Sequence, residues 1–98
     1  MELTSKQRAT LRSKASIIEP IFQIGKGSLS DNQIKGIEEA IEKRELIKIT
    51  VLRSCEDEAK YLAEDIASEI GATVVCTIGG KIVLYRRSKS DKVKHIEF

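Results

Sequence analysis

The spacing of apolar residues changes repeatedly along this chain, and that change restricts the folds open to it. Residues 46–52 alternate apolar with other side chains, as in a strand with one face buried. Ile34, Ile37 and Ile41 instead recur at spacings of three and four, as on one face of a helix. A chain of 98 residues has room for one domain. The sequence therefore predicts a single domain in which helices and strands alternate.

The pattern predicts three helices and four strands in the order α-β-α-β-α-β-β. The helices are expected over about residues 5–16, 30–44 and 54–70, and the strands over 21–24, 46–52, 73–78 and 81–86. Helix-length connections between the first three strands predict βαβ units with right-handed crossovers. Gly79-Gly80 predicts a two-residue hairpin between the last two strands. The expected fold class is α/β (α+β), a compact domain with a mixed four-stranded sheet packed with three helices.

Short signals mark where the helices begin and end. Thr4 opens a T-x-x-Q motif and Ser30 opens an S-x-x-Q motif, and both fit capping boxes at helix starts. The stretch 54–57 offers a similar N-terminal cap for the third helix. Gly71 follows the last apolar residue of that helix, where a left-handed residue commonly ends a helix.

Charge is unevenly distributed along the chain, although the net charge is only +2. Residues 1–16 carry four Lys or Arg against one acid, and residues 71–98 carry six against two. Residues 31–70 carry six against eleven acids. If both ends lie on one side, the molecule has a basic face; the alternative is ordinary surface charge. The domain is expected to span residues 1–87, with the polar, basic residues 88–98 as a frayed tail.

Several classes of function find no support in the sequence. Cys55 and Cys76 form no CxxC pair and His95 is the sole histidine, so a zinc site lacks its set of about four N or S ligands. Reduced thiols fit a cytoplasmic protein, and no apolar run approaches the roughly 20 residues that span a membrane. We expect a cytoplasmic monomer with no cofactor, no metal and no membrane partner. We also expect no enzyme, because the carboxylates in and after the second helix resemble a solvated face; these are Glu38, Glu39, Glu42 and Glu45.

The loop Gly25-Lys26-Gly27-Ser28 lies between the first strand and the second helix. The start of a helix presents unpaired N–H groups, and glycines let the backbone approach a phosphate closely. Lys26 adds a cation at the tip of the loop. The segment fits neither a Walker A loop nor a dinucleotide-binding fingerprint. It is therefore a candidate phosphate cradle, and the alternative is a simple turn.

Four segments of the chain together carry a pattern that none carries alone. They are residues 3–12 (LTSKQRATLR), 24–30 (IGKGSLS), 45–49 (ELIKI) and 78–86 (IGGKIVLYR), with Ile34, Ile37 and Ala40 after the second. In this order they resemble the CRM domain, named for chloroplast RNA splicing and ribosome maturation. Its bacterial single-domain members are called YhbY proteins. The resemblance extends over about residues 3–87.

The resemblance implies both a fold and a function. The implied fold is that of the C-terminal domain of translation initiation factor three. The implied function is binding of structured RNA, and bacterial members associate with precursors of the large ribosomal subunit. We therefore expect an RNA-binding protein of ribosome assembly whose partners are ribosomal RNA and, in addition, ribosomal proteins. The family has a GxxG loop, in which Gly25 would be the first glycine. Ser28 stands at the second position, so we expect Gly27 to serve in its place.

The predicted RNA-binding residues are the loop and the basic residues near both ends of the chain: Gly25, Lys26, Gly27, Ser28, Lys6, Arg8, Arg12, Lys14, Arg86 and Arg87. We expect the two basic ends to converge beside the loop and form one anion-attracting surface. Lys48 could reach RNA from the sheet, but a side chain that extends to solvent from a strand edge is the favoured interpretation. Two alternatives remain open. One is a DNA-binding or chromatin-type protein of related topology, and the other is a protein-interaction module of the ribosome whose acidic middle segment meets a basic partner.

Overall fold

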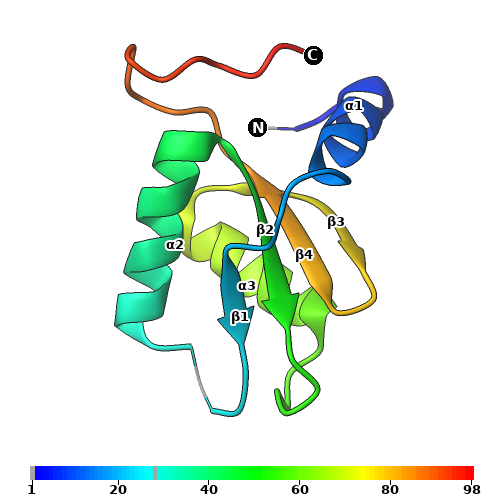
Figure 1. Cartoon of the computed structure of the whole chain (residues 1–98), viewed down its shortest axis with the longest axis vertical. Coiled ribbons are helices and arrows are strands. Elements are labelled where there is room, and N and C mark those ends of the chain that lie inside the picture. The colour runs from blue at the N-terminus through cyan, green and yellow to red at the C-terminus, as the bar shows by residue number, and fades with distance from the viewer. Residues whose placement is uncertain (1, 28) are drawn as a thin grey trace.

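The computed structural model describes residues 2–27 and 29–98 and consists of three layers (Figure 1). The helices are α1 (Ser5–Ala15), α2 (Asp31–Arg44) and α3 (Ala59–Ile70). The strands are β1 (Phe22–Ile24), β2 (Leu46–Val51), β3 (Thr73–Ile78) and β4 (Lys81–Tyr85). Helix α1 packs on one face of the sheet, and α2 and α3 pack on the other. The predicted order of elements is confirmed.

The four strands form one mixed sheet in the order β1-β2-β4-β3. β1 and β2 are parallel, whereas β4 is antiparallel to both β2 and β3. The chain from β2 through α3 to β3 therefore leaves a gap of one strand, which β4 fills by turning back at Gly79-Gly80. In the resulting register Lys48 lies opposite Val83.

Side chains of the two central strands alternate between two separate apolar cores. Ile47 and Ile49 of β2 face α2 and α3, together with Ile82 and Leu84 of β4. On the other face, the smaller core beneath α1 contains Leu11, Ala15, Leu46, Val75, Val83 and Tyr85. Because α1 has a single long buried side chain, Leu11, it covers only part of its face of the sheet.

The helix starts agree with the sequence in two cases out of three. Thr4 and Ser30 both close capping boxes with the residue three positions on, as predicted. The third start is wrong, because α3 begins at Ala59 and its N-cap residue makes no side-chain cap. The segment that was expected to cap this helix instead forms a turn, in which the Cys55 N–H donates to the Leu52 carbonyl. Gly71 ends α3 in the left-handed conformation, at φ +66°, as predicted.

The expectation of a frayed C-terminal tail is wrong. Glu45, at the end of α2, is fully buried and accepts hydrogen bonds from the backbone N–H of Ser88 (2.6 Å) and of Ile96 (2.7 Å). Its carboxylate also lies 2.6 Å from Nδ1 of His95. The rings of Phe98 and Tyr85 pack edge to face, with 5.4 Å between centroids. The tail is therefore held across the upper end of the fold, and Glu45 is its anchor rather than part of a solvated face.

Opposing effects act on the pKa of the Glu45 carboxyl. Burial raises the pKa, but hydrogen bonds from His95, Ser88 and Ile96 lower it more, so the net pKa lies below the ordinary value. A carboxylate with a lowered pKa stabilises the fold above its ordinary pKa, and this contribution is lost as the pH falls through the lowered value. The backbone of Glu45 also has φ +66°, a conformation that costs energy for a residue with a side chain.

We expect Glu45→Gln to lower the free energy of unfolding at neutral pH by about 1.5–3 kcal/mol. The reason is that an amide offers one acceptor oxygen where the carboxylate accepts several charge-assisted bonds. Urea denaturation at neutral pH measures the loss. The difference from wild type should shrink as the pH falls through the lowered pKa of the Glu45 carboxyl, because the wild-type carboxyl then takes up a proton.

The matched control is Glu39→Gln, an exposed carboxylate on α2. That variant should have the same free energy of unfolding as wild type at every pH tested. Equal stability of the Glu45 and Glu39 variants at neutral pH would contradict the anchoring role of Glu45.

Candidate nucleic-acid interface

The glycine loop connects β1 to α2 at the lower end of the molecule in Figure 1. Gly27 has φ +98°, which confirms that this glycine takes the conformation that a side chain would disfavour. A Cβ at Gly25 would lie 3.4 Å from the side chains of Leu52 and Ser54, so the loop packs closely on the segment after β2. Ser28 lies outside the described residues.

Two carboxylates flank the cation of this loop. Lys26 and Gly27 border a small surface hollow of about 180 Å³ together with Glu56 and Asp57. These acids offset part of the attraction that Lys26 exerts on an anion. The loop is therefore a weaker phosphate cradle than its sequence suggests.

Among the cations of α1, Arg8 has a structural partner. Its Nη1 donates to the carbonyls of Val74 (2.7 Å) and Val75 (2.6 Å), at the point where the pairing of β3 with β4 shifts register. A bulge leaves backbone groups without partners in the sheet, and Arg8 supplies the missing donor. The remaining predicted cations of α1 are exposed: Lys6, Arg12 and Lys14.

Arg86, which was expected to contact an RNA phosphate, donates its hydrogen bonds to groups of the protein itself. Its guanidinium donates to the Ile70 carbonyl (2.8 Å), to Glu38 (3.2 Å) and to Glu42 (2.9 Å), and its side chain is 12% exposed. The carboxylates of α2 and the last carbonyl of α3 thus meet on one side chain. Arg87, the next residue, is exposed.

Glu42 joins this arrangement to the tail. It accepts hydrogen bonds from the Ser88 hydroxyl (2.7 Å) and the Lys89 N–H. Those bonds, and to a lesser degree the bond and charge of Arg86, lower the pKa of the Glu42 carboxyl despite an opposing effect of burial. Arg86 therefore belongs to the junction of α2, α3 and the tail.

The expected convergence of the basic ends beside the loop is wrong. In Figure 1, α1 and the C-terminus lie at the upper end of the long axis and the glycine loop lies at the lower end. The two basic ends do meet each other, since Lys14 and Lys94 border the same hollow. The cause is the anchoring of the tail at Glu45, which brings residues 94–97 beside α1.

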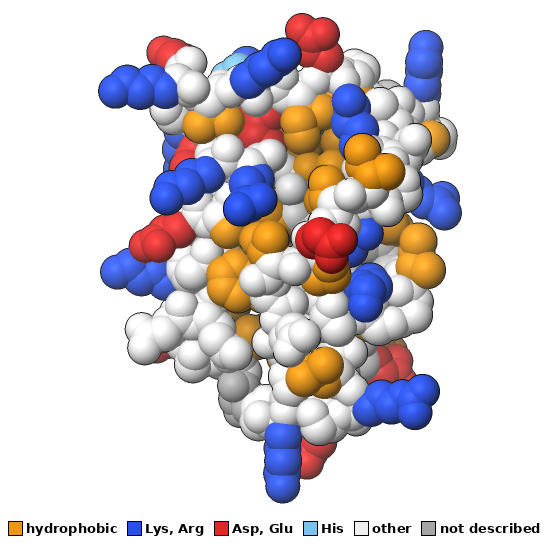
Figure 2. Space-filling view, in the orientation of Figure 1, with side chains coloured by type: hydrophobic (Ala, Val, Ile, Leu, Met, Phe, Trp, Pro, Cys, Tyr) orange, Lys and Arg blue, Asp and Glu red, His pale blue; other side chains and the backbone are white. Residues whose placement is uncertain are grey.

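A cleft that was not predicted from the sequence lies where α1 meets the sheet. Cations from three elements border it, namely Arg12 of α1, Lys48 of β2 and Lys81 of β4. The cleft has a volume of about 170 Å³, and its other lining residues are Ala15, Ser16, Cys76, Ile78 and Val83. Figure 2 shows Lys and Arg side chains both at the margin and within the face of this side of the molecule, with apolar surface and some carboxylates among them. We call this feature the basic cleft.

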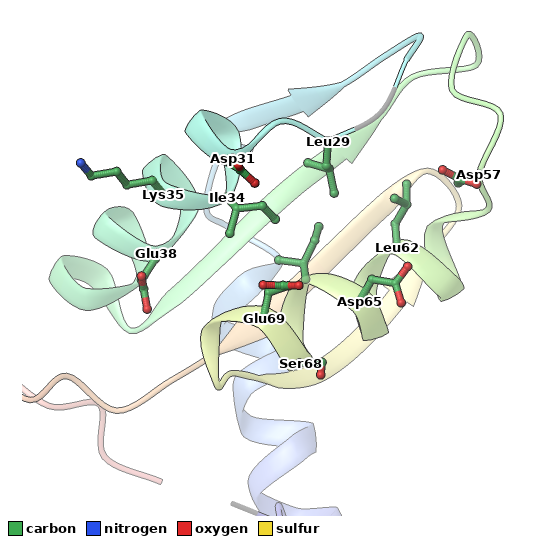
Figure 3. Close-up of a pocket in the computed structure, with 11 residues that line it drawn as sticks. Leu29, Asp31, Ile34, Lys35, Glu38, Asp57, Leu62, Asp65, Ser68 and Glu69 are labelled. Atoms are coloured by element: carbon green, nitrogen blue, oxygen red, sulfur yellow. The ribbon is translucent and has the colours of Figure 1, made fainter.

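The opposite side of the sheet carries an acidic groove between α2 and α3. It has a volume of about 650 Å³, and Leu29, Ile34 and Leu62 contribute its apolar lining. Lys35 is the cation that borders the groove. The carboxylates that surround it come from both helices and the adjoining segments, and they are Asp31, Glu38, Asp57, Asp65 and Glu69. Figure 3 shows these side chains along the two helices. A polyanion would be repelled from this groove.

A family model described as the CRS1/YhbY (CRM) domain matches residues 3–86. The chain belongs to this family. The chain is 51% identical over 90 residues to "Probable RNA-binding protein YqeI" of Bacillus subtilis, covering 92% of this chain and 94% of the relative. It is 32% identical over 92 residues to an "RNA-binding protein" of Haemophilus influenzae, covering 94% and 93%.

A solved structure supports the fold. The solution structure of the hypothetical protein SAV1595 from Staphylococcus aureus superposes with a TM-score of 0.77 at 46% identity. The match covers 97% of this chain and 100% of that one. The resemblance to the CRM family is thus confirmed, as is the expected fold class.

The described parts of this CRM domain contain neither a candidate metal site nor a candidate membrane-spanning helix. Residues 2–27 and 29–98 contain no group of three His, Cys, Asp or Glu placed to hold a metal ion. None of the helices within those ranges has the length and apolar character needed to cross a membrane. Cys55 and Cys76 are both free thiols.

We expect Arg86→Ala to lower the free energy of unfolding by about 2–4 kcal/mol. The substitution leaves two carboxylates and a carbonyl without their shared donor, and removing one member of a largely buried ion pair is costly. Arg87→Ala removes the same charge from an exposed position and should stay within about 0.5 kcal/mol of wild type. Urea denaturation of both variants measures the difference, and equal midpoints would contradict the structural role of Arg86.

Proposed function

We propose that this CRM domain binds structured RNA, and that its physiological ligand is ribosomal RNA in precursors of the large ribosomal subunit. The names of relatives that align over more than nine-tenths of the chain support RNA as the ligand class. We further propose that it acts as a cytoplasmic monomer that also meets ribosomal proteins during assembly. Its chemistry is binding, not catalysis.

The observation that carries this proposal is a set of exposed cations that form no ion pair with a carboxylate. Within residues 2–27 and 29–98, the ion pairs involve Arg86 and His95. Lys6, Lys14 and Lys26 are exposed and form no such pair there, although Glu56 and Asp57 border the same hollow as Lys26. Exposed cations without carboxylate partners are available to neutralise phosphates, and the release of counterions then favours binding.

Two contact points at opposite ends of the molecule suit a structured ligand. The long axis measures 35 Å, with α1 near one end and the glycine loop near the other. At the loop, backbone N–H groups of Gly25 to Gly27 and the start of α2 would clamp the RNA backbone. At α1, Lys6 and Lys14 would contact phosphates of a second segment. A folded RNA can present backbone at both points.

We expect the triple variant Lys6→Ala, Lys14→Ala and Lys26→Ala to bind structured ribosomal RNA more weakly. The slope of log K against log salt should also fall by about one for each phosphate that the variant no longer neutralises. Fluorescence anisotropy across a salt series measures both quantities. Lys35→Ala, which removes a cation from the acidic groove, is the control and should bind as wild type does. Unchanged affinity and slope in the triple variant would contradict the proposed surface.

The alternatives predict different outcomes in two further measurements. A DNA-binding protein would prefer duplex DNA to structured RNA at matched salt, whereas an RNA-binding protein exploits A-form shape and the 2′-hydroxyls. A protein-interaction module would keep its ribosomal partners after nuclease treatment, because the acidic groove would hold a basic partner without RNA. Crosslinking in cells followed by sequencing of the bound RNA tests the ribosomal assignment directly.

A further inference from the structure

The basic cleft brings together three cations that are far apart in the sequence. Arg12 comes from α1, Lys48 from the middle of β2 and Lys81 from the start of β4. None of the three forms an ion pair with the described residues, whose ion pairs involve Arg86 and His95. The cleft is thus a cationic site without a counter-charge from the protein.

The strand register forces the two lysines onto the same side of the sheet. Lys48 lies opposite Val83, and Lys81 lies opposite Thr50. Residues directly opposite share a face, and so do residues two apart on one strand. Lys48 and Lys81 are therefore diagonal neighbours, with backbones about 7–8 Å apart. Their charges repel, and an anion placed between them relieves that repulsion.

The floor of the cleft is apolar and partly open to solvent. Cys76 and Val83 lie opposite each other on β3 and β4, and Ile78 lies opposite Lys81. Ile78 is 59% exposed, so the floor offers apolar surface to a ligand. A ligand that matches this cleft needs both an anionic group and a flat apolar part.

We infer that the basic cleft binds one unpaired nucleotide of the RNA. Its phosphate lies among Arg12, Lys48 and Lys81, and its base lies on Cys76, Ile78 and Val83. This inference rests on the proposed function and adds a third RNA contact between the glycine loop and α1. A cleft of about 170 Å³ has room for a single base, and a base pair, which is larger, would extend beyond its lining. The site therefore selects RNA with an unpaired loop over a continuous duplex.

Cys76 provides a reporter inside the cleft, and Cys55 provides a matched reporter outside it. Both are free, partly exposed thiols. Cys55 packs against the core beneath α2 and α3, on the other side of the sheet. The probe is an RNA hairpin from large-subunit ribosomal RNA with an unpaired loop, and the readout is the rate of alkylation of each thiol by a small maleimide.

With this hairpin at about ten times its dissociation constant, alkylation of Cys76 should slow about tenfold while that of Cys55 stays unchanged. A continuous duplex of the same length should protect Cys76 much less. The double variant Lys48→Gln and Lys81→Gln should lose the protection, and its salt slope should fall by about one, because the two lysines share a single phosphate. Lys35→Gln with Lys43→Gln removes the same charge from α2 and should keep both properties.

The outcomes separate the inference from the function on which it rests. If the hairpin binds but Cys76 is alkylated at the unbound rate, the cleft is not a nucleotide site and the RNA-binding function stands. If heparin protects Cys76 as well as the hairpin does, the cleft binds any polyanion and the assignment of a base is overturned. If neither RNA binds at all, the proposed function fails and the inference with it.

Discussion

β2 and β4 lie at the centre of the sheet, and each places its side chains alternately on two faces. One face receives Ile47, Ile49 and Ile82 and is closed by α2 and α3. The other receives Lys48 and Lys81 and is only partly covered by α1. This alternation sets the distribution of charge, because the helices that close the first face bring the carboxylates with them. RNA can approach the side of the sheet that carries α1.

Buried charge holds the outer parts of the molecule in place. Glu45 draws the C-terminal tail across the upper end of the fold, and Arg86 ties α2 to the end of α3. Both groups have several hydrogen-bond partners, as a charge removed from water requires. Arg8 does the same for the bulge of β3. Three charged residues near the ends of elements thus stabilise the fold, and the cations left free are those available to a ligand.

Local signals predicted the elements well, and long-range contacts escaped prediction. The capping box at Thr4 and the turn at Gly79-Gly80 depend on neighbouring residues, so their sequence suffices. The partners of Arg86 lie 44 and 48 residues away on α2, and nothing in the local sequence points to them. The local sequence does not predict the basic cleft either, because the cleft depends on the register of β2 with β4. The family resemblance identified the RNA-binding class, but the positions of the loop and α1 needed the structure.

The central claim is that RNA occupies the side of the sheet that carries α1 and leaves the acidic groove free. Titration of isotope-labelled protein with a ribosomal RNA hairpin, followed by amide chemical shifts, tests it most directly. Shifts should move at Arg12, Lys48 and Lys81, at the glycine loop and at the first turn of α2, and stay constant along the rest of α2 and along the exposed face of α3. Movement confined to the acidic groove, around Lys35 and Asp65, would contradict the claim.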